Sequence, residues 1–388
     1  MTDADTPEWT LPADLLARIA ERAPRYDAEN AFCAEDLDEL RAAGWLRIGV
    51  PVEQGGSGFG LAATSAAQRV LARAAPATAL GLGMHQVWVQ AARAVSARGG
   101  AFLQAVTDHA SDDHLLAFGV SEPGNDAVLF DSSTTAEPDG DGGYRFTGTK
   151  VFTSLAPAWD VLSVFGKDDT GPEPRLVHGF VLRSDGDVEH LDDWDTLGMR
   201  ATQSRTTRLH GVHVPASRIV RSLPVGPNQD PLVFGIFAAF ELLVASVYVG
   251  IAERAVTLAA SAVAARTTLD GTPRSADPDV RRAIADARGA VDAVELQVSS
   301  LARSVDEQDD LGTRWFPLLV GTKARAVDTA QHVVDEAMRV VGGGAFRATS
   351  ELARLARDVR AGQYHPSSRD SAARTIAASV LGPLAPLG

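Results

Sequence analysis

The chain has 388 residues, of which 45% are hydrophobic and 22% charged, a composition typical of a soluble globular protein with substantial cores. Its net charge of -14 argues against a nucleic-acid partner, because such a partner requires a basic face. The single cysteine, Cys33, excludes an internal disulfide, and residues 1–12 lack the basic and apolar regions of a signal peptide, so we expect a cytoplasmic protein.

The first part of the chain, residues 1–114, is predicted to form a helical domain. Apolar side chains recur there at helical spacing over residues 14–25, 34–43, 64–75 and 78–97. The last of these helices contains Gly81 and Gly83. Each glycine costs about 1 kcal/mol relative to alanine inside a helix. We therefore expect a ligand or a crossing helix to pack closely against this point.

The middle of the chain, residues 115–228, is predicted to form a β domain. Short apolar or alternating runs, separated by Gly, Pro and Asp, lie at residues 145–146, 161–165, 177–182, 206–209 and 212–214. Residues 139–143 predict the tight turn of a hairpin. Residues 148–150 predict a second turn, after which another strand begins. Several short strands at this spacing indicate a small barrel or sandwich.

The last part, residues 229–388, is predicted to form an antiparallel helix bundle. Long helices are expected at residues 234–266, 279–305, 315–341 and 367–380. The fold class is therefore α+β, with an N-terminal helical domain, a central β-barrel or sandwich and a C-terminal bundle. The most apolar stretch, residues 234–251, contains Glu241 and suits a bundle helix better than a membrane span.

The first long bundle helix also bears on assembly. It is apolar nearly all round, so it requires cover on every side. Symmetric pairing of two bundles would supply that cover, and we expect a homotetramer built as a dimer of dimers. A monomer whose bundle covers itself is the alternative.

Residues 118–154 contain the pattern that bears most on function. Pro123 lacks an N–H group and disfavours helix at the residue before it, so a strand should end in a turn at Glu122-Pro123-Gly124. Backbone N–H groups in such a turn can face an anionic or carbonyl-rich ligand. Strand ends that carry Ser, Thr and Phe suit a flat aromatic ligand, with a ring to stack and hydroxyls to reach its heteroatoms. A plain hairpin with surface loops is the alternative.

The same stretch carries a family resemblance. Residues 120–126, followed by residues 143–154, resemble the central flavin-binding region of the acyl-CoA dehydrogenase superfamily. Further segments resemble other motifs of that family in the same order and spacing, namely residues 50–58, 197–202, 341–346 and 355–358. The resemblance extends over nearly the whole chain and implies a flavin-dependent oxidoreductase that acts on a small molecule.

The resemblance also implies where the flavin binds. Phe118, Val120 and Ser121 match the strand that lines the cofactor in the family. Phe152, Thr153 and Ser154 match the segment that covers the isoalloxazine ring, where Phe can stack and Ser can offer a hydroxyl near the flavin N5. The turn after Glu122 is two residues shorter than the family pattern and lacks its serine, which puts recognition of CoA in doubt.

The adenine half of the cofactor is usually held across a subunit interface in this family. The matching positions here are Arg266, Thr268, Arg339, Gly342 and Gly343. Arginine is well suited to a pyrophosphate, although Arg266 can also be a solvated residue at a helix end. The resemblance implies FAD, with FMN as the alternative.

The catalytic base of the family has no counterpart in its usual place. Pro366 falls at the position of the family's Glu, and proline cannot take a proton. An alternative Glu position in the family matches Phe240, next to Glu241. One residue along a helix rotates a side chain by about 100°, so we expect Glu241 to point elsewhere as a buried, paired carboxylate, with a role as base as the alternative.

Two histidines remain as candidate catalytic residues. His85 and His365 resemble a pair in the flavin-dependent monooxygenase branch of the superfamily, whose members use reduced flavin from a separate reductase. Histidine titrates near neutral pH and suits general acid–base work, although each can instead be a structural histidine. The resemblance thus favours a monooxygenase. An acyl-CoA dehydrogenase that introduces an α,β double bond and a catalytically silent flavin-binding protein are the alternatives. No cluster has metal-ligand spacing, so no metal is expected.

Overall fold

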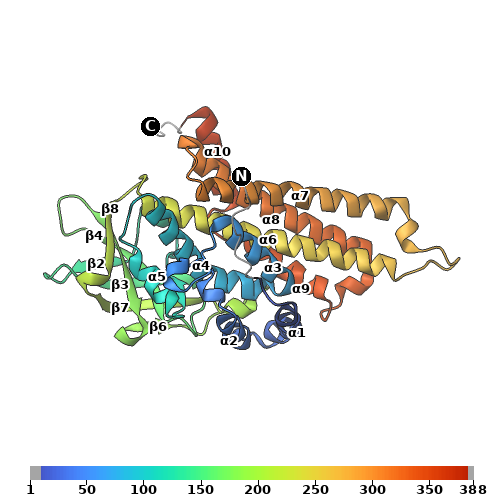
Figure 1. The fold of residues 1–388 in the computed structure, drawn as a ribbon, viewed down its shortest axis with the longest axis horizontal. Helices are drawn as coiled ribbons and strands as arrows, with labels where there is room; N and C mark the ends of the chain where they lie inside the picture. Colours follow the sequence, from blue (N-terminus) through green and yellow to red (C-terminus); the bar gives the residue numbers. More distant parts are fainter. Residues whose placement is uncertain (1–9, 383–388) are drawn as a thin grey trace.

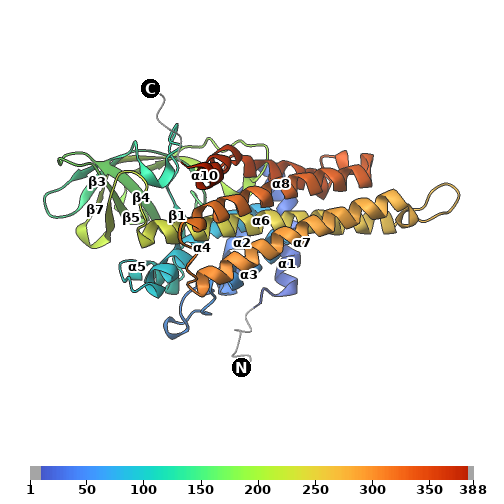
Figure 2. The ribbon, with the colours of Figure 1, turned by 90° about the horizontal axis from the view of Figure 1, so that it is seen from above.

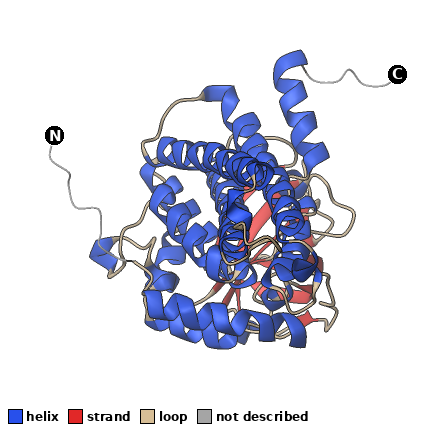
Figure 3. Cartoon of the chain, turned by 90° about the vertical axis from the view of Figure 1, so that its right-hand side faces the viewer, coloured by secondary structure: helices blue, strands red, loops and turns tan. Residues whose placement is uncertain are grey.

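The computed structural model describes residues 10–382 and shows an elongated molecule with a sheet at one end and a long helix bundle at the other (Figure 1). Figure 3 looks along the bundle, so that the strands lie behind the helices. Helical segments come first in the chain, the sheet follows, and helices return. This order confirms the predicted fold class.

The N-terminal part consists of the helices α1 (Ala13–Glu29), α2 (Ala34–Ala42), α3 (Leu61–Ala74), α4 (Pro76–Ala97) and α5 (Gln104–Ser111). A β-carbon at Gly83 would lie 2.3 Å from Nε2 of Gln68, on α3, and one at Gly81 would meet Thr202 Cα at 3.6 Å. A crossing helix therefore accounts for Gly83, which is one of the two explanations that the sequence offered, the other being a ligand. Gln68 uses the space to donate to the carbonyl of Ala79 at 2.6 Å.

The described strands form a single mixed sheet. They are β1 (Leu116–Phe118), β2 (Thr135–Pro138), β3 (Tyr144–Thr153), β4 (Val161–Asp168), β5 (Arg175–Leu182), β6 (Val188–His190), β7 (Arg205–Val214) and β8 (Ile219–Pro224). The hydrogen-bonded order is β6-β7-β3-β2-β4-β5-β8, and β1 pairs with β4 in parallel. This path runs from β6 to β8, so the described strands form an open sheet.

The predicted hairpin is confirmed, because β2 and β3 pair antiparallel from Thr135 with Thr147 to Pro138 with Tyr144. The predicted turn at residues 148–150 is wrong, since β3 continues through it. Gly148 is there for a different reason: a β-carbon would lie 2.5 Å from Oγ1 of Thr134. The glycine therefore permits two backbone segments to approach closely, which is a common use of glycine inside a strand.

The C-terminal part contains α6 (Pro231–Ala264), α7 (Pro278–Asp306), α8 (Trp315–Val341), α9 (Glu351–Asp358) and α10 (Arg369–Leu381). The sequence placed the start of α6 three residues late. Pro231 occupies the first helical turn, and the Asp230 carboxylate caps the helix by accepting from Leu232 N at 2.9 Å. An N-cap Asp followed by Pro is a strong start signal for a helix.

Helix α6 lies at the centre of the bundle, in contact with α3, α4, α7 and α8 (Figure 2). It is long and apolar enough to cross a membrane, but 83% of its most apolar window is buried inside the structure. Its burial is that of a core helix in a soluble protein. The premise of the assembly argument is therefore wrong, because the chain covers α6 by itself. The homotetramer stays a prediction without that support.

Candidate active site

A cavity of about 1060 Å³ lies where the sheet meets the N-terminal half of α6 and the segment that leads from α9 to α10. Its walls combine aromatic rings, hydroxyls and arginines. The side chains that matter below include Phe118, Ser121, Phe152, Ser154, Trp194, Thr202, Ser204, Phe237, Phe240, Glu241, Arg357, Arg360, His365, Ser367 and Arg374.

The cavity contains the predicted ring-binding residues, with one exception. Phe118, Val120, Ser121, Phe152 and Ser154 all line it, whereas Thr153 is buried and does not. Phe152 has a φ of 56° and leaves 54% of its surface exposed. The left-handed backbone conformation is rare for an aromatic residue and is typical of functional sites.

Two aromatic pairs shape the cavity walls. The ring of Phe152 meets Trp194 edge-on, with centroids 6.2 Å apart. Phe118 stacks on Phe240 of α6 at 5.7 Å. Flat apolar walls of this kind favour an aromatic ligand, because offset and edge-to-face contacts add to the burial of its surface.

A chain of hydroxyls runs along one wall and has a fixed direction. Thr202 donates to the carbonyl of Met199 at 2.8 Å, and this uses its only hydroxyl hydrogen. Ser204 must therefore donate to Thr202 at 2.7 Å, and Ser154 must donate to Ser204 at 2.7 Å. Ser154 has then used its own hydrogen. It presents only lone pairs to the cavity and can accept a hydrogen bond but not give one.

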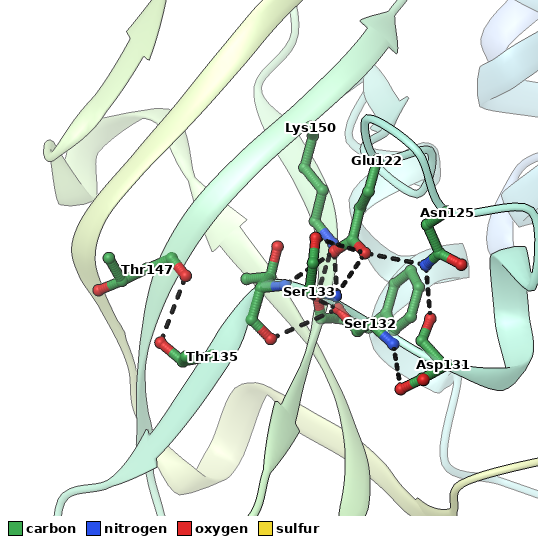
Figure 4. A network of polar contacts seen from close by, with 10 residues as sticks. Glu122, Asn125, Asp131, Ser132, Ser133, Thr135, Thr147 and Lys150 are labelled. Carbon is green, nitrogen blue, oxygen red and sulfur yellow. Dashed lines mark hydrogen bonds and ion pairs between the residues drawn. The ribbon is translucent and has the colours of Figure 1, made fainter.

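The turn at Glu122 is built on a buried ion pair (Figure 4). Lys150 Nζ donates to Glu122 Oε1 at 2.6 Å, and both side chains are fully buried. Glu122 also accepts from Ser132 Oγ at 2.6 Å and from Ser133 N at 2.7 Å. Burial alone would raise the pKa of Glu122, but the Lys150 ammonium and these donors hold it well below its usual range. The carboxylate thus fixes the loop that borders the cavity.

Glu241 lies in the cavity wall beside Phe240, so the prediction that it points elsewhere is wrong. The cavity is wide enough for two successive residues of α6 to border it. Glu241 Oε1 accepts from Ser367 N at 3.1 Å and from Ser367 Oγ at 3.0 Å. Its Oε2 is buried and has no hydrogen-bond partner among the described residues. Burial raises the pKa of Glu241 to about 7, against the opposing charge of Lys323.

His365 also lines the cavity, where Tyr248 of α6 orients it. The Tyr248 hydroxyl lies 2.8 Å from His365 Nε2. Burial lowers the pKa of His365 to about 3, and the nearby Lys323 ammonium acts in the same direction. The imidazole is therefore neutral at physiological pH, and Tyr248 determines which nitrogen remains for a ligand.

His85 is not brought to the cavity. It is fully buried on α4, and both ring nitrogens bond to backbone: Nε2 lies 2.8 Å from the carbonyl of Leu46, and Nδ1 lies 3.1 Å from Leu116 N. Because a carbonyl only accepts and an N–H only donates, His85 is the neutral tautomer with its proton on Nε2. Burial lowers its pKa to about 4. These contacts match the structural alternative, and the two histidines do not form a pair.

The residues matched to the adenine half lie at the other end of the bundle. Arg266 follows the C-terminus of α6 and donates to the carbonyl of Val341, next to Gly342 and Gly343. Thr268 bonds within its own loop, and Arg339 pairs with Glu336 on α8. From Glu241 to Arg266 the helix advances roughly 35 Å at 1.5 Å per residue. This cluster does not line the cavity of its own chain.

Sequence reasoning missed several residues of the site. Trp194 is the clearest. It stands within an acidic loop (Asp192, Asp193, Asp195), and this was a usable signal, because a large aromatic side chain in an exposed loop usually contacts a partner. Lys323 was also missed. It is buried on α8 and donates to the carbonyls of Gly362, His365 and Ser367, a contact that no local pattern indicates.

The cavity fits a flavin. Phe152 and Trp194 offer ring surfaces for the isoalloxazine, and Ser154 offers an acceptor for a ring N–H group. Of the arginines that line the cavity, Arg357 and Arg360 pair with Asp27 and Asp335, and Arg374 can supply positive charge for a phosphate. A bound flavin would supply the redox chemistry, and the side chains would position it and exclude water.

Comparison with known proteins agrees with this geometry. The model of the acyl-CoA dehydrogenase N-terminal domain matches residues 15–99, and that of the C-terminal domain matches residues 242–369. The chain is 29% identical to L-evernosamine nitrososynthase of Micromonospora sp., over 97% of this chain and 91% of that protein. It is 25% identical to dibenzothiophene monooxygenase of Rhodococcus qingshengii, over 93% and 90%.

A solved structure gives the same relationship. The X-ray structure of KijD3 in complex with FMN and dTDP-3-amino-2,3,6-trideoxy-4-keto-3-methyl-D-glucose superposes with a TM-score of 0.86 at 26% identity, covering 97% of this chain and 93% of that one. The cofactor class is therefore a flavin. The chain belongs to the acyl-CoA dehydrogenase superfamily and is an enzyme of its flavin-dependent monooxygenase branch.

Proposed function

We propose that this enzyme binds reduced flavin supplied by a separate reductase and uses it, with molecular oxygen, to oxygenate a nitrogen or sulfur atom of a small molecule. The observation that carries the proposal is the directed chain of hydroxyls that ends at Ser154. Reduction of a flavin adds hydrogen to N5 and converts that nitrogen from an acceptor to a donor. Ser154 accepts only, so this wall favours the reduced form.

The family's usual base position supports the same reading. Pro366 stands there and lines the cavity, and it cannot remove a proton from a thioester substrate. The names of the relatives indicate which substrate atom is oxygenated. One is a nitrososynthase and another a dibenzothiophene monooxygenase, which suggests nitrogen or sulfur as the atom that receives oxygen.

We favour FMN over the FAD that the resemblance implied. The KijD3 complex contains FMN. The positions matched to the adenine half, Arg266 among them, lie roughly 35 Å along α6 from the cavity, so one chain by itself offers a site for FMN. FAD would require those residues from a second subunit. We further propose that the enzyme works in the cytoplasm.

Oxygen transfer is tested directly with isotopes. Purified enzyme is supplied with FMN, NADH, a flavin reductase and ¹⁸O₂, with thioanisole and 2-phenylethylamine as substrates. We expect one ¹⁸O atom in the product, measured by mass spectrometry. Photoreduced FMN should replace the reductase and NADH. The proposal would be contradicted if neither substrate were oxygenated, or if the oxygen atom in the product came from water.

Dehydrogenation of an acyl thioester is the second candidate, because Glu241 does border the cavity. A carboxylate there can in principle take the α-proton. Anaerobic addition of acyl-CoA compounds of increasing chain length to the oxidised enzyme would then bleach the flavin absorbance. We expect no bleaching, and a bleached spectrum at any chain length would favour the dehydrogenase instead.

A further inference from the structure

One carboxylate oxygen, buried in the wall of the cavity, lacks a partner. Glu241 is 1% exposed, and its Oε2 makes no hydrogen bond with any described residue. The side chain borders the cavity on α6 together with Phe237, Phe240 and Val244, so its surroundings are mostly apolar. An unpaired polar atom in such a place is costly unless a ligand satisfies it.

The charged and titratable groups that face Glu241 from neighbouring elements form their hydrogen bonds with other atoms than Oε2. Lys323, on α8, directs its ammonium to the carbonyls of Gly362, His365 and Ser367, at 3.3, 2.9 and 2.9 Å. His365, on the segment before α10, uses Nε2 for its contact with Tyr248. Ser367 donates to the other carboxylate oxygen.

We infer that Glu241 Oε2 binds the ammonium group of a primary-amine substrate and then accepts one of its protons. In that step an N–H bond breaks, an O–H bond forms on Oε2, and the electron pair stays on nitrogen. The neutral amine can then accept the oxygen atom that reduced flavin and molecular oxygen supply. This inference rests on the proposed function and narrows its substrate class to amines.

The physical chemistry of the site suits both roles. A buried carboxylate pairs strongly with a cation, because hydrogen bonds between charged groups are stronger than neutral ones and little water competes. Burial raises the pKa of Glu241 to about 7, which makes the carboxylate a usable base near neutral pH. The fixed Oε1 contacts hold the carboxylate plane while Oε2 exchanges a proton.

Binding measurements test the inference without turnover. Isothermal titration at pH 8 compares primary amines from ethylamine to 2-phenylethylamine with the alcohols of equal length. We expect the wild-type chain to bind at least one amine about tenfold tighter than its alcohol, the effect of one charged hydrogen bond. Glu241→Gln keeps the shape and an acceptor for Ser367 and should abolish the preference.

The matched control is Glu253→Gln, the same change on α6 at a carboxylate that faces Arg69 and Arg73. It should keep the preference. In the wild-type chain the preference should fall as pH drops through about 7, because Glu241 then gains a proton. A preference that survives Glu241→Gln, or no preference in any pair, overturns the inference.

Turnover separates this inference from the proposed function. We expect the ratio of kcat/KM for 2-phenylethylamine to kcat/KM for thioanisole to fall at least tenfold in Glu241→Gln and to keep its wild-type value in Glu253→Gln. If the wild-type enzyme oxygenates both substrates and Glu241→Gln keeps the wild-type ratio, the amine role fails and the monooxygenase stands. If the wild-type enzyme oxygenates neither, the proposed function itself fails.

Discussion

At the scale of single residues, the site depends on polar groups whose roles follow from what each can donate or accept. Glu122 and Lys150 form a buried pair that several hydroxyl and backbone donors complete. Ser154 can only accept a hydrogen bond from a ligand, because it donates to Ser204, which donates to Thr202, which donates to a backbone carbonyl. The first arrangement supports the loop, and the second faces the ligand.

Replacing Lys150 with methionine should destabilise the protein. Glu122 would remain as an unpaired buried charge, which costs about 3–5 kcal/mol. Urea unfolding monitored by circular dichroism measures the loss. The double variant Glu122→Gln with Lys150→Met should lose less, since no charge is left unpaired. An equal or larger loss in the double variant would contradict this account.

The same pair predicts the pH dependence of wild-type stability. The pKa of Glu122 is lower in the folded than in the unfolded protein. Its contribution is therefore complete above the unfolded value, about 4.3, and is lost as pH falls below it toward the folded pKa. The slope of unfolding free energy against pH below pH 4 should be shallower in Glu122→Gln than in the wild-type chain.

Replacing Thr202 with valine should change the preference between flavin redox states. Without the Thr202 hydroxyl, Ser204 and then Ser154 are free to reverse and donate. We expect wild-type protein to bind reduced FMN about tenfold tighter than oxidised FMN, and the variant to lose most of that ratio. Anaerobic fluorescence titration provides both dissociation constants. Thr107→Val, a hydroxyl on α5 outside the cavity, is the control and should leave the ratio unchanged.

At the scale of elements, the segment between α9 and α10 forms one wall of the cavity and carries His365. It is attached from two helices. Lys323 on α8 binds three of its carbonyls, and Glu241 on α6 binds Ser367. Side chains far away in sequence therefore help to position this wall, in addition to its own 3-10 helix at Val359–Gln363.

Replacing Lys323 with methionine should release that wall. Three carbonyls would lose a donor, and leaving the buried one, that of Gly362, unsatisfied costs about 1–3 kcal/mol. We expect faster amide hydrogen exchange over residues 359–368 and at least tenfold weaker FMN binding. Lys167→Met, which removes a partly exposed pair with Asp131, should cost no more than about 1 kcal/mol. Unchanged exchange in the Lys323 variant would show that the segment is held by other contacts.

At the scale of the whole molecule, α6 connects the two ends of the enzyme. Its N-terminal half borders the cavity, and its C-terminal end leads to Arg266. The chain covers this helix itself, so apolar surface does not demand a second subunit. Any assembly must then be explained by other surfaces, such as the bundle end that exposes Leu269 and Phe346.

Assembly and cofactor choice are tested together. We expect a homotetramer by light scattering at micromolar concentration, with Arg266 placed near the cofactor of another subunit. Arg266→Ala should stay tetrameric, weaken FAD binding about tenfold and leave FMN binding unchanged. Arg282→Ala, an exposed residue of α7, is the control. A flavin-bound species of 40.8 kDa would contradict the tetramer.

Local signals were sufficient for much of the fold. Apolar spacing located the long helices, and the glycine-rich turn at residues 139–143 located the β2–β3 hairpin. The short elements α5, α9, β6 and β8 were missed, because three to eight residues carry too little periodicity to stand out. The ordered motifs identified the family and several ring-binding residues such as Phe152, since these lie on one continuous segment of chain.

The chemistry of the cavity was decided by packing. From sequence, His85 and His365 were equivalent candidates, and only the backbone contacts of His85 distinguish them. Helical geometry alone predicted that Glu241 points away from the site. The width of the cavity and the missing partner of Oε2, however, depend on how α6 packs against α8 and the segment before α10. The sequence by itself determined the order of elements, the family and the flavin. Which polar atoms meet one another was decided by the tertiary structure, because hydrogen-bond partners such as Glu241 and Ser367 are 126 residues apart in the sequence.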